Sequence, residues 1–163
     1  NIVTGFNLLP GTMAIKNWLP LVIVLVSLDW FGTTIIAFTC WQIGIEVNWT
    51  EGVHEPSLFG SQWDLILSGI ELIVWAPILE EIVNRGLVLV SLRAILSPTV
   101  AVMSSAVLFA FFHFTSVPGF LVLFWSGILL AYSYQRFHSL LPCILVHAAG
   151  NLLHLSTVWL FYR

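Results

Sequence analysis

The chain has 163 residues, of which 59% are hydrophobic and 8% are charged, with a formal net charge of -3. An average soluble domain is about 45–50% apolar and about 25% charged, and a soluble fold of this size could not hide such an apolar excess from water. These values exclude an ordinary soluble globule, a disordered tail and a basic nucleic-acid-binding protein. We therefore expect an integral membrane protein that contacts lipid and binds no nucleic acid.

Mostly apolar stretches of the length needed for membrane helices, about 20 residues, occur in five places. They cover approximately residues 18–41, 65–96, 99–115, 119–135 and 140–162. A polar, acidic stretch at 46–64 separates the first two, and Ser97-Pro98 ends the second because proline disfavours helix in the residue before it. The sequence predicts an all-α polytopic transmembrane bundle of about five helices, with residues 1–163 forming a single membrane domain.

The start of the chain has no recognisable signal peptide. Residues 1–15 lack the charged beginning and the small-residue cleavage site that such a peptide carries. Because the sequence starts at Asn1 rather than Met, we expect that a preceding segment has been removed or left out.

Several polar side chains fall inside the apolar stretches, where such residues are costly and usually functional. Lys16, Arg93 and Arg136 fall on one side of such a bundle, which we expect to be the cytoplasmic side. At about 1.5 Å of rise per residue from the helix ends on that side, Glu80 lies about 18 Å deep and His113 about 22 Å. By the same measure His147 lies about 12 Å deep and Asn151 about 18 Å. All four fall in one layer about 10 Å thick near the bilayer centre, so we expect one shared site with a polar character. Asp29 is expected to face water or another helix instead.

Helical spacing divides these residues into pairs, because residues four apart share a face. Glu81 lies one turn before Arg85, and Glu80 points about 100° away from Glu81. We therefore predict that Glu81 and Arg85 neutralise each other and support the helix, while Glu80 remains available for chemistry. His147 and Asn151 are also four apart, and the small residues between them allow another helix or a substrate backbone to come close.

Two hydrolytic arrangements fit these residue types. A Glu beside a His can deprotonate water, and a His–Asn pair can donate hydrogen bonds to an oxyanion that develops on a carbonyl. Alternatively, Glu80, His113 and His147 form a carboxylate and two imidazoles, a zinc-like ligand set with one open position. The sequence leaves both open, and with them a single divalent metal as cofactor. No HExxH or GxSxG motif is present, and no Ser or Cys is plainly paired with a base, so serine and thiol mechanisms are disfavoured.

Three motifs follow one another on separate apolar stretches. Residues 80–85 match EExxxR, residues 109–113 match FxxxH, and residues 147–151 match HxxxN. This ordered trio resembles the CPBP (CAAX protease and bacteriocin-processing, "Abi") family of intramembrane proteases, which includes the type II CAAX prenyl endopeptidases. The resemblance covers about residues 65–155, which would form the catalytic core. One position departs from the family pattern: Asn84 stands where an aromatic residue is common, and we expect it to tune Glu80 or to shape a substrate groove.

The resemblance implies catalytic roles for four residues and supporting roles for two, namely Glu80, His113, His147 and Asn151, and Glu81 and Arg85. In the family, the first Glu and the FxxxH His are held to activate water, and the HxxxN pair to stabilise the oxyanion or to complete a metal site. The expected activity is therefore hydrolysis of a peptide bond in a membrane-associated protein or peptide. Because the family has bacterial members, we expect the bacterial plasma membrane as its location.

Two other functions remain open at the level of the sequence. Some members of the resembling family are discussed as immunity or partner-regulating proteins, which would make this a membrane binding protein with a vestigial site. A proton-coupled carrier that uses Glu80 and the histidines as a relay is the third alternative. The carrier is disfavoured, because five apolar stretches without an internal repeat do not match the usual plan of carriers.

Overall fold

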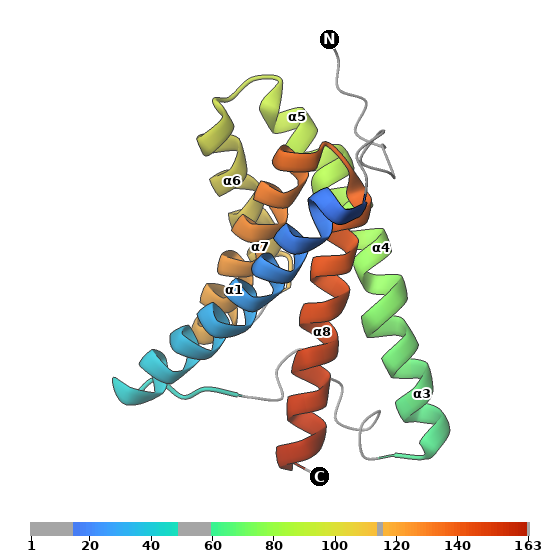
Figure 1. Ribbon diagram of the computed structural model, residues 1–163. Coiled ribbons are helices and arrows are strands. Elements are labelled where there is room, and N and C mark those ends of the chain that lie inside the picture. Colours follow the sequence, from blue (N-terminus) through green and yellow to red (C-terminus); the bar gives the residue numbers. More distant parts are fainter. Residues whose placement is uncertain (1–14, 49–59, 114–115, 163) are drawn as a thin grey trace.

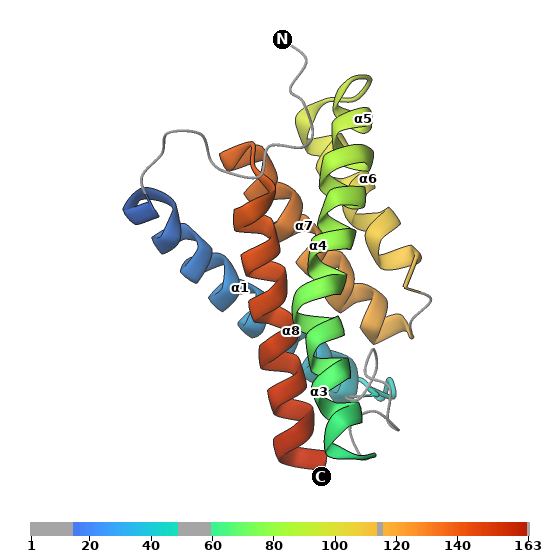
Figure 2. The same cartoon turned by 90° about the vertical axis from the view of Figure 1, so that its right-hand side faces the viewer.

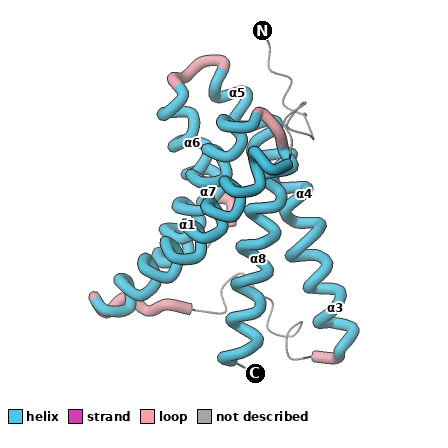
Figure 3. The backbone as a smooth tube through the Cα atoms, viewed as in Figure 1, coloured by secondary structure: helices cyan, strands magenta, loops and turns pink. Residues whose placement is uncertain are grey.

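The computed structural model describes residues 15–48, 60–113 and 116–162, and within these ranges every regular element is a helix (Figure 3). The central part of the acidic 46–64 stretch, residues 49–59, lies outside the described residues. In chain order the elements are α1 (Ile15–Gln42), α3 (Gln62–Ile70), η1 (Glu71–Trp75), α4 (Ala76–Glu81), η2 (Ile82–Leu89), α5 (Val90–Arg93), α6 (Pro98–Phe111), α7 (Val117–Phe137) and α8 (Leu140–Tyr162).

Elements α3 to α5 follow one another without a break and form one continuous helical rod, so the described chain consists of five rods (Figure 1). These correspond to the five apolar stretches of the sequence and confirm the expected helical bundle. Three helices, α1, α7 and α8, are long and apolar enough to cross a membrane. Helix α6 has 14 residues, or about 21 Å at 1.5 Å per residue, which is shorter than the hydrocarbon core of about 30 Å.

Local sequence signals explain where the helices begin. Ser61 and Asp64 form a capping box at the start of α3, because each side chain accepts a hydrogen bond from the other's backbone N–H. Helix α6 starts with Pro98, whose missing N–H costs nothing in the first turn. Ser116 caps α7 by accepting a hydrogen bond from the backbone N–H of Gly119. The chain between α7 and α8 turns at His138, which has a left-handed φ of 49°.

Two π-helical segments interrupt the rod formed by α3 to α5. Segment η1 lies directly before the helical turn that contains Pro77, a residue without an N–H to continue the α-helical pattern. Segment η2 begins at Ile82, directly after Glu81. Such wide turns are rare in proteins and often occur at functional sites. Here they flank the two adjacent glutamates.

Helix α8 occupies the middle of the bundle. It contacts α1 and α7 on one side and α4 and η1 on the other, and both views show it running beside the α3–α5 rod (Figures 1 and 2). The main apolar core joins α1, α6, α7 and α8, with Leu25, Phe109 and Val146 among its buried members. Helix α8 therefore lies between the main apolar core and the α3–α5 rod.

The outer faces of the bundle are apolar. On α1, Phe31 is 65% exposed and Ile35 is 64% exposed, and large exposed hydrophobic side chains occur on every rod. In water this surface would be strongly unfavourable, whereas lipid tails solvate it. Together with the three long apolar helices, it identifies an integral membrane protein.

Candidate active site

Glu80, from α4, lies between two histidines that come from two other helical rods. Its Oε2 atom is 3.5 Å from Nε2 of His113, just beyond the end of α6, and 3.8 Å from Nε2 of His147 on α8. This oxygen is buried, and no group in the described ranges reaches it with hydrogen-bond geometry. The side chains of Glu80 and His113 are each 31% exposed and that of His147 is 9% exposed. The site is therefore open at Glu80 and His113 and closed behind His147.

Both imidazoles are oriented through their Nδ1 atoms. Nδ1 of His113 is 2.7 Å from the carbonyl oxygen of Phe109, and Nδ1 of His147 is 2.8 Å from Oε1 of Glu81. A carbonyl can only accept, and an ionised carboxylate likewise, so each Nδ1–H must be the donor. In the neutral rings Nε2 is therefore the unprotonated nitrogen, and it is this atom that lies near Glu80. The backbone of α6 and the second glutamate thus fix which nitrogen faces the reactive position.

Glu81 and Arg85 form a fully buried ion pair with two close contacts. Nε of Arg85 is 3.1 Å from Oε2 of Glu81, and Nη1 is 3.1 Å from Oε1. Nη2 of Arg85 donates to the carbonyl of Gly127 at 3.2 Å, and the guanidinium lies 4.8 Å from the ring centre of Phe109. The pair predicted from the spacing is present. Its second function, holding His147, was not predicted because it joins residues 66 positions apart.

Asn151 lies one turn beyond His147 on α8 but does not contact Glu80. Its Nδ2 atom donates to the carbonyl of Leu72 at 2.8 Å, which ties α8 to η1. The amide has a second N–H, and Asn151 and His147 line a common small cavity. Asn84, expected to tune the carboxylate of Glu80, is instead buried and donates to the backbone carbonyl of Glu80 at 2.9 Å. That bond supports the π-helical turn rather than the carboxylate.

Asp29 on α1 is a polar residue of this region that the sequence motifs did not indicate. Its Oδ1 atom accepts a hydrogen bond of 2.6 Å from Ser126 on α7, and the residue lines the small cavity together with His147 and Asn151. The available signal was its position inside an otherwise apolar stretch, which marks intramembrane acids as functional candidates. The expectation that it faces another helix is met by Ser126, but the shared cavity was missed.

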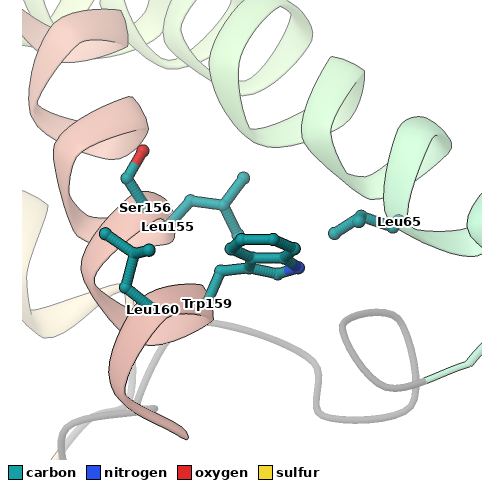
Figure 4. A pocket seen from close by; sticks show the side chains of 5 residues that line it. All are labelled: Leu65, Leu155, Ser156, Trp159 and Leu160. Atoms are coloured by element: carbon teal, nitrogen blue, oxygen red, sulfur yellow. The ribbon is translucent and has the colours of Figure 1, made fainter. Parts of the chain in front are cut away.

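A larger pocket of about 380 Å³ lies between α3 and α8, away from these groups. Figure 4 shows its lining, with Leu65 facing four residues of α8: Leu155, Ser156, Trp159 and Leu160. Its polar groups are the hydroxyl of Ser156 and the indole N–H of Trp159. None of its lining residues can act as an acid, a base or a metal ligand at neutral pH. This pocket therefore offers no group for acid–base chemistry, in contrast to the Glu80 region.

The fit of a metal can be judged from the donor atoms. Glu80, His113 and His147 supply the right chemistry for a zinc-like ion, and their outer hydrogen bonds resemble those that orient metal ligands. Within the described ranges, however, no group of three His, Cys, Asp or Glu side chains is arranged so that it could hold a metal ion. The arrangement of these described residues therefore does not fit a resident metal.

The fold and this site define a polytopic helical membrane protein with a carboxylate and two imidazoles gathered between its helices. The family model described as "Type II CAAX prenyl endopeptidase Rce1-like" matches residues 62–153, more than half of the chain. The protein belongs to this family, which is one of proteases and hence of hydrolases. The matched range contains all three motifs but not Asp29. No curated protein and no solved structure matches the chain.

Proposed function

We propose that the protein is an intramembrane endopeptidase that hydrolyses a peptide bond of a membrane-associated protein or peptide. The observation that carries this proposal is the position of Glu80, whose Oε2 atom lies within 4 Å of two imidazole Nε2 atoms. A carboxylate beside two oriented imidazoles is suited to bind and deprotonate a water molecule. Residues 65–155 would form the catalytic core.

The proton balance of the buried groups supports this assignment. Two carboxylates, Glu80 and Glu81, and one guanidinium, Arg85, leave one net negative charge among closely packed groups. One further proton, shared among Glu80, His113 and His147, makes the cluster neutral, and uncompensated charge in such a setting is costly. When His147 holds this proton, its Nε2–H becomes a donor, while its Nδ1–H remains bonded to Glu81.

The reaction then follows from these groups. Glu80, oriented with His113, takes a proton from water while the water oxygen bonds to the carbonyl carbon of the substrate. The electron pair of the carbonyl moves to its oxygen, which accepts hydrogen bonds from Nε2–H of His147 and from the second N–H of Asn151. The electron pair on that oxygen then re-forms the carbonyl bond as the C–N bond breaks. The C–N electron pair goes to nitrogen, and Glu80 returns the proton to that nitrogen. The products are an amine and a carboxylic acid.

The membrane setting supports the substrate class and the location. The reactive groups lie among helices whose outer faces are apolar, so the scissile bond must come from a chain that is itself held in or at the bilayer. We place the protein in the bacterial plasma membrane, on the resemblance of its motifs to a family with bacterial members. Prenylated substrates are an association of the family, and the catalytic groups described here do not require a prenyl chain.

The decisive variant is Glu80→Gln, which keeps the shape of the side chain but cannot accept the proton. We expect it to abolish proteolysis while the protein remains folded and inserted. The matched control is Glu71→Gln, the same chemical change on the same rod at an exposed position. Both variants and the wild type would be reconstituted in liposomes with a membrane-protein fraction, and new peptide termini would be identified by mass spectrometry.

The proposal requires termini that appear with the wild type and with Glu71→Gln and disappear with Glu80→Gln. Near-wild-type turnover by Glu80→Gln would contradict the role of this carboxylate. A different outcome is that neither the wild type nor the control generates new termini, yet cells with Glu80→Gln lose a protective phenotype that cells with the wild type have. The endopeptidase assignment is then wrong, and the immunity alternative is favoured.

A further inference from the structure

A small polar cavity lies on the side of His147 that faces α1 and α7. It measures about 50 Å³, and four of its lining residues are polar: Asp29, Ser126, His147 and Asn151. The remaining lining is apolar and includes Phe109 and Val146, which are 2% and 1% exposed. One wall of the cavity, formed by α1, lies outside the range matched by the family model.

Asp29 supplies the carboxylate in the lining of this cavity. Its Oδ1 atom is engaged by Ser126, and within the described ranges no other group donates a hydrogen bond to this carboxylate. Its Oδ2 atom points toward Gly150, where an added Cβ would lie only 2.9 Å away. The bare backbone at Gly150 thus keeps space open between the carboxylate and α8.

The size and lining of the cavity select its occupant. A water molecule takes about 30 Å³ in the liquid and needs two to four polar partners, and both conditions are met here. The volume is too small for a large amino-acid side chain of a substrate. A carboxylate at this depth also needs hydration or a partner to offset the cost of leaving water.

We infer that Asp29 makes this cavity a water-binding site that holds water against the His147–Asn151 face of α8. The inference rests on the proposed function, because each hydrolysis consumes one water molecule and hydrocarbon contains almost none. Asp29 is a positioning residue in this scheme: it does not touch the substrate but keeps water beside the groups that use it.

Four variants separate the water site from a structural role. Asp29→Asn keeps an acceptor for Ser126 and a polar group toward the cavity, whereas Asp29→Leu keeps the branched shape but is larger and has no polar group. Gly150→Ala leaves every hydrogen-bonding group in place and fills the cavity. Gly69→Ala is its matched control, because a Cβ at Gly69 meets no atom within 4 Å.

The readout that does not depend on proteolysis is radiolytic labelling of the protein in lipid nanodiscs, in which X-ray pulses oxidise side chains next to bound water. Phe109 and Val146 are shielded from bulk solvent, so their oxidation reports water in the cavity. Leu25, equally buried on α1 but not part of the lining, is the internal reference. We expect labelling of Phe109 and Val146 in the wild type, Asp29→Asn and Gly69→Ala, and a several-fold loss in Asp29→Leu and Gly150→Ala.

Turnover per folded molecule should follow the labelling. We expect kcat to fall about ten-fold in Gly150→Ala and Asp29→Leu, the effect of losing one hydrogen bond, with KM unchanged. Undiminished labelling in Gly150→Ala, or no labelling of Phe109 and Val146 in the wild type, would overturn the inference. If the labelling pattern is as expected but Glu80→Gln remains active, the water site stands and the proposed catalytic assignment fails.

Discussion

The carboxylate of Glu81 is used on both oxygens. Oε2 pairs with Nε of Arg85, while Oε1 contacts both Nη1 of Arg85 and Nδ1 of His147. One side chain therefore neutralises a buried cation and also fixes the ring that faces Glu80. Removal of Arg85 should therefore mainly affect folding, whereas removal of His147 should mainly affect the chemistry at Glu80.

Arg85→Ala should destabilise the fold more than His147→Ala does. Without Arg85, Glu81 is left as a fully buried charge, and breaking such a pair costs about 3–5 kcal/mol. His147→Ala leaves the ion pair intact. Thermal unfolding in detergent, followed by tryptophan fluorescence, compares the two directly. The double variant Glu81→Leu/Arg85→Met should recover much of the stability, because it removes both charges, yet remain inactive. Equal melting of the two single variants would contradict this role of the pair.

Asn151→Ala tests whether the amide stabilises an oxyanion. We expect kcat to fall by roughly 10²–10³-fold, the typical effect of losing one preorganised donor, with little change in KM. Metal content measured on the purified protein should be the same before and after the substitution, and chelators should not inhibit. Stoichiometric zinc in the wild type that disappears in His147→Ala would instead favour the ligand role of His147.

Helices α6 and α7 come into backbone contact at one glycine. A Cβ at Gly127 would lie 3.0 Å from Cα of Ala106, and the carbonyl of the same glycine accepts a hydrogen bond from Arg85. A larger residue at this position would therefore disturb both the α6–α7 contact and the hydrogen bond from Arg85 that supports the ion pair. The close approach explains why a residue without a side chain stands in the middle of α7.

Gly127→Ala should destabilise the protein by about 1–3 kcal/mol, because overpacking a tight contact forces the helices apart. We expect a lower Tm and an unchanged KM for Gly127→Ala. The control is Gly69→Ala, measured in parallel, because a Cβ at Gly69 meets no atom within 4 Å. A Tm for Gly127→Ala equal to that of the control would show that α6 and α7 can separate without cost.

For the molecule as a whole, the helices were predictable and part of the site was not. Apolar length gave the five rods, and the depths of Glu80, His113 and His147 indicated that they would meet, because both depend on spacing along single helices. Spacing says nothing about contacts between helices, so the bond from His147 to Glu81 and the cavity behind Asp29 appear only in the structure. The catalytic roles of these residues remain predictions.

The short length of α6 affects how the products of the proposed cleavage would leave the site. The amine and the carboxylic acid of the proposed reaction become an ammonium and a carboxylate by later proton transfer, and both ions are strongly disfavoured in hydrocarbon. A helix of about 21 Å is shorter than the bilayer core, and lipid adapts to such a helix by thinning around it. His113 stands at the end of this helix. On the proposed function, the new chain ends form beside this short helix, where a thinned bilayer shortens their path to the headgroups and favours their departure.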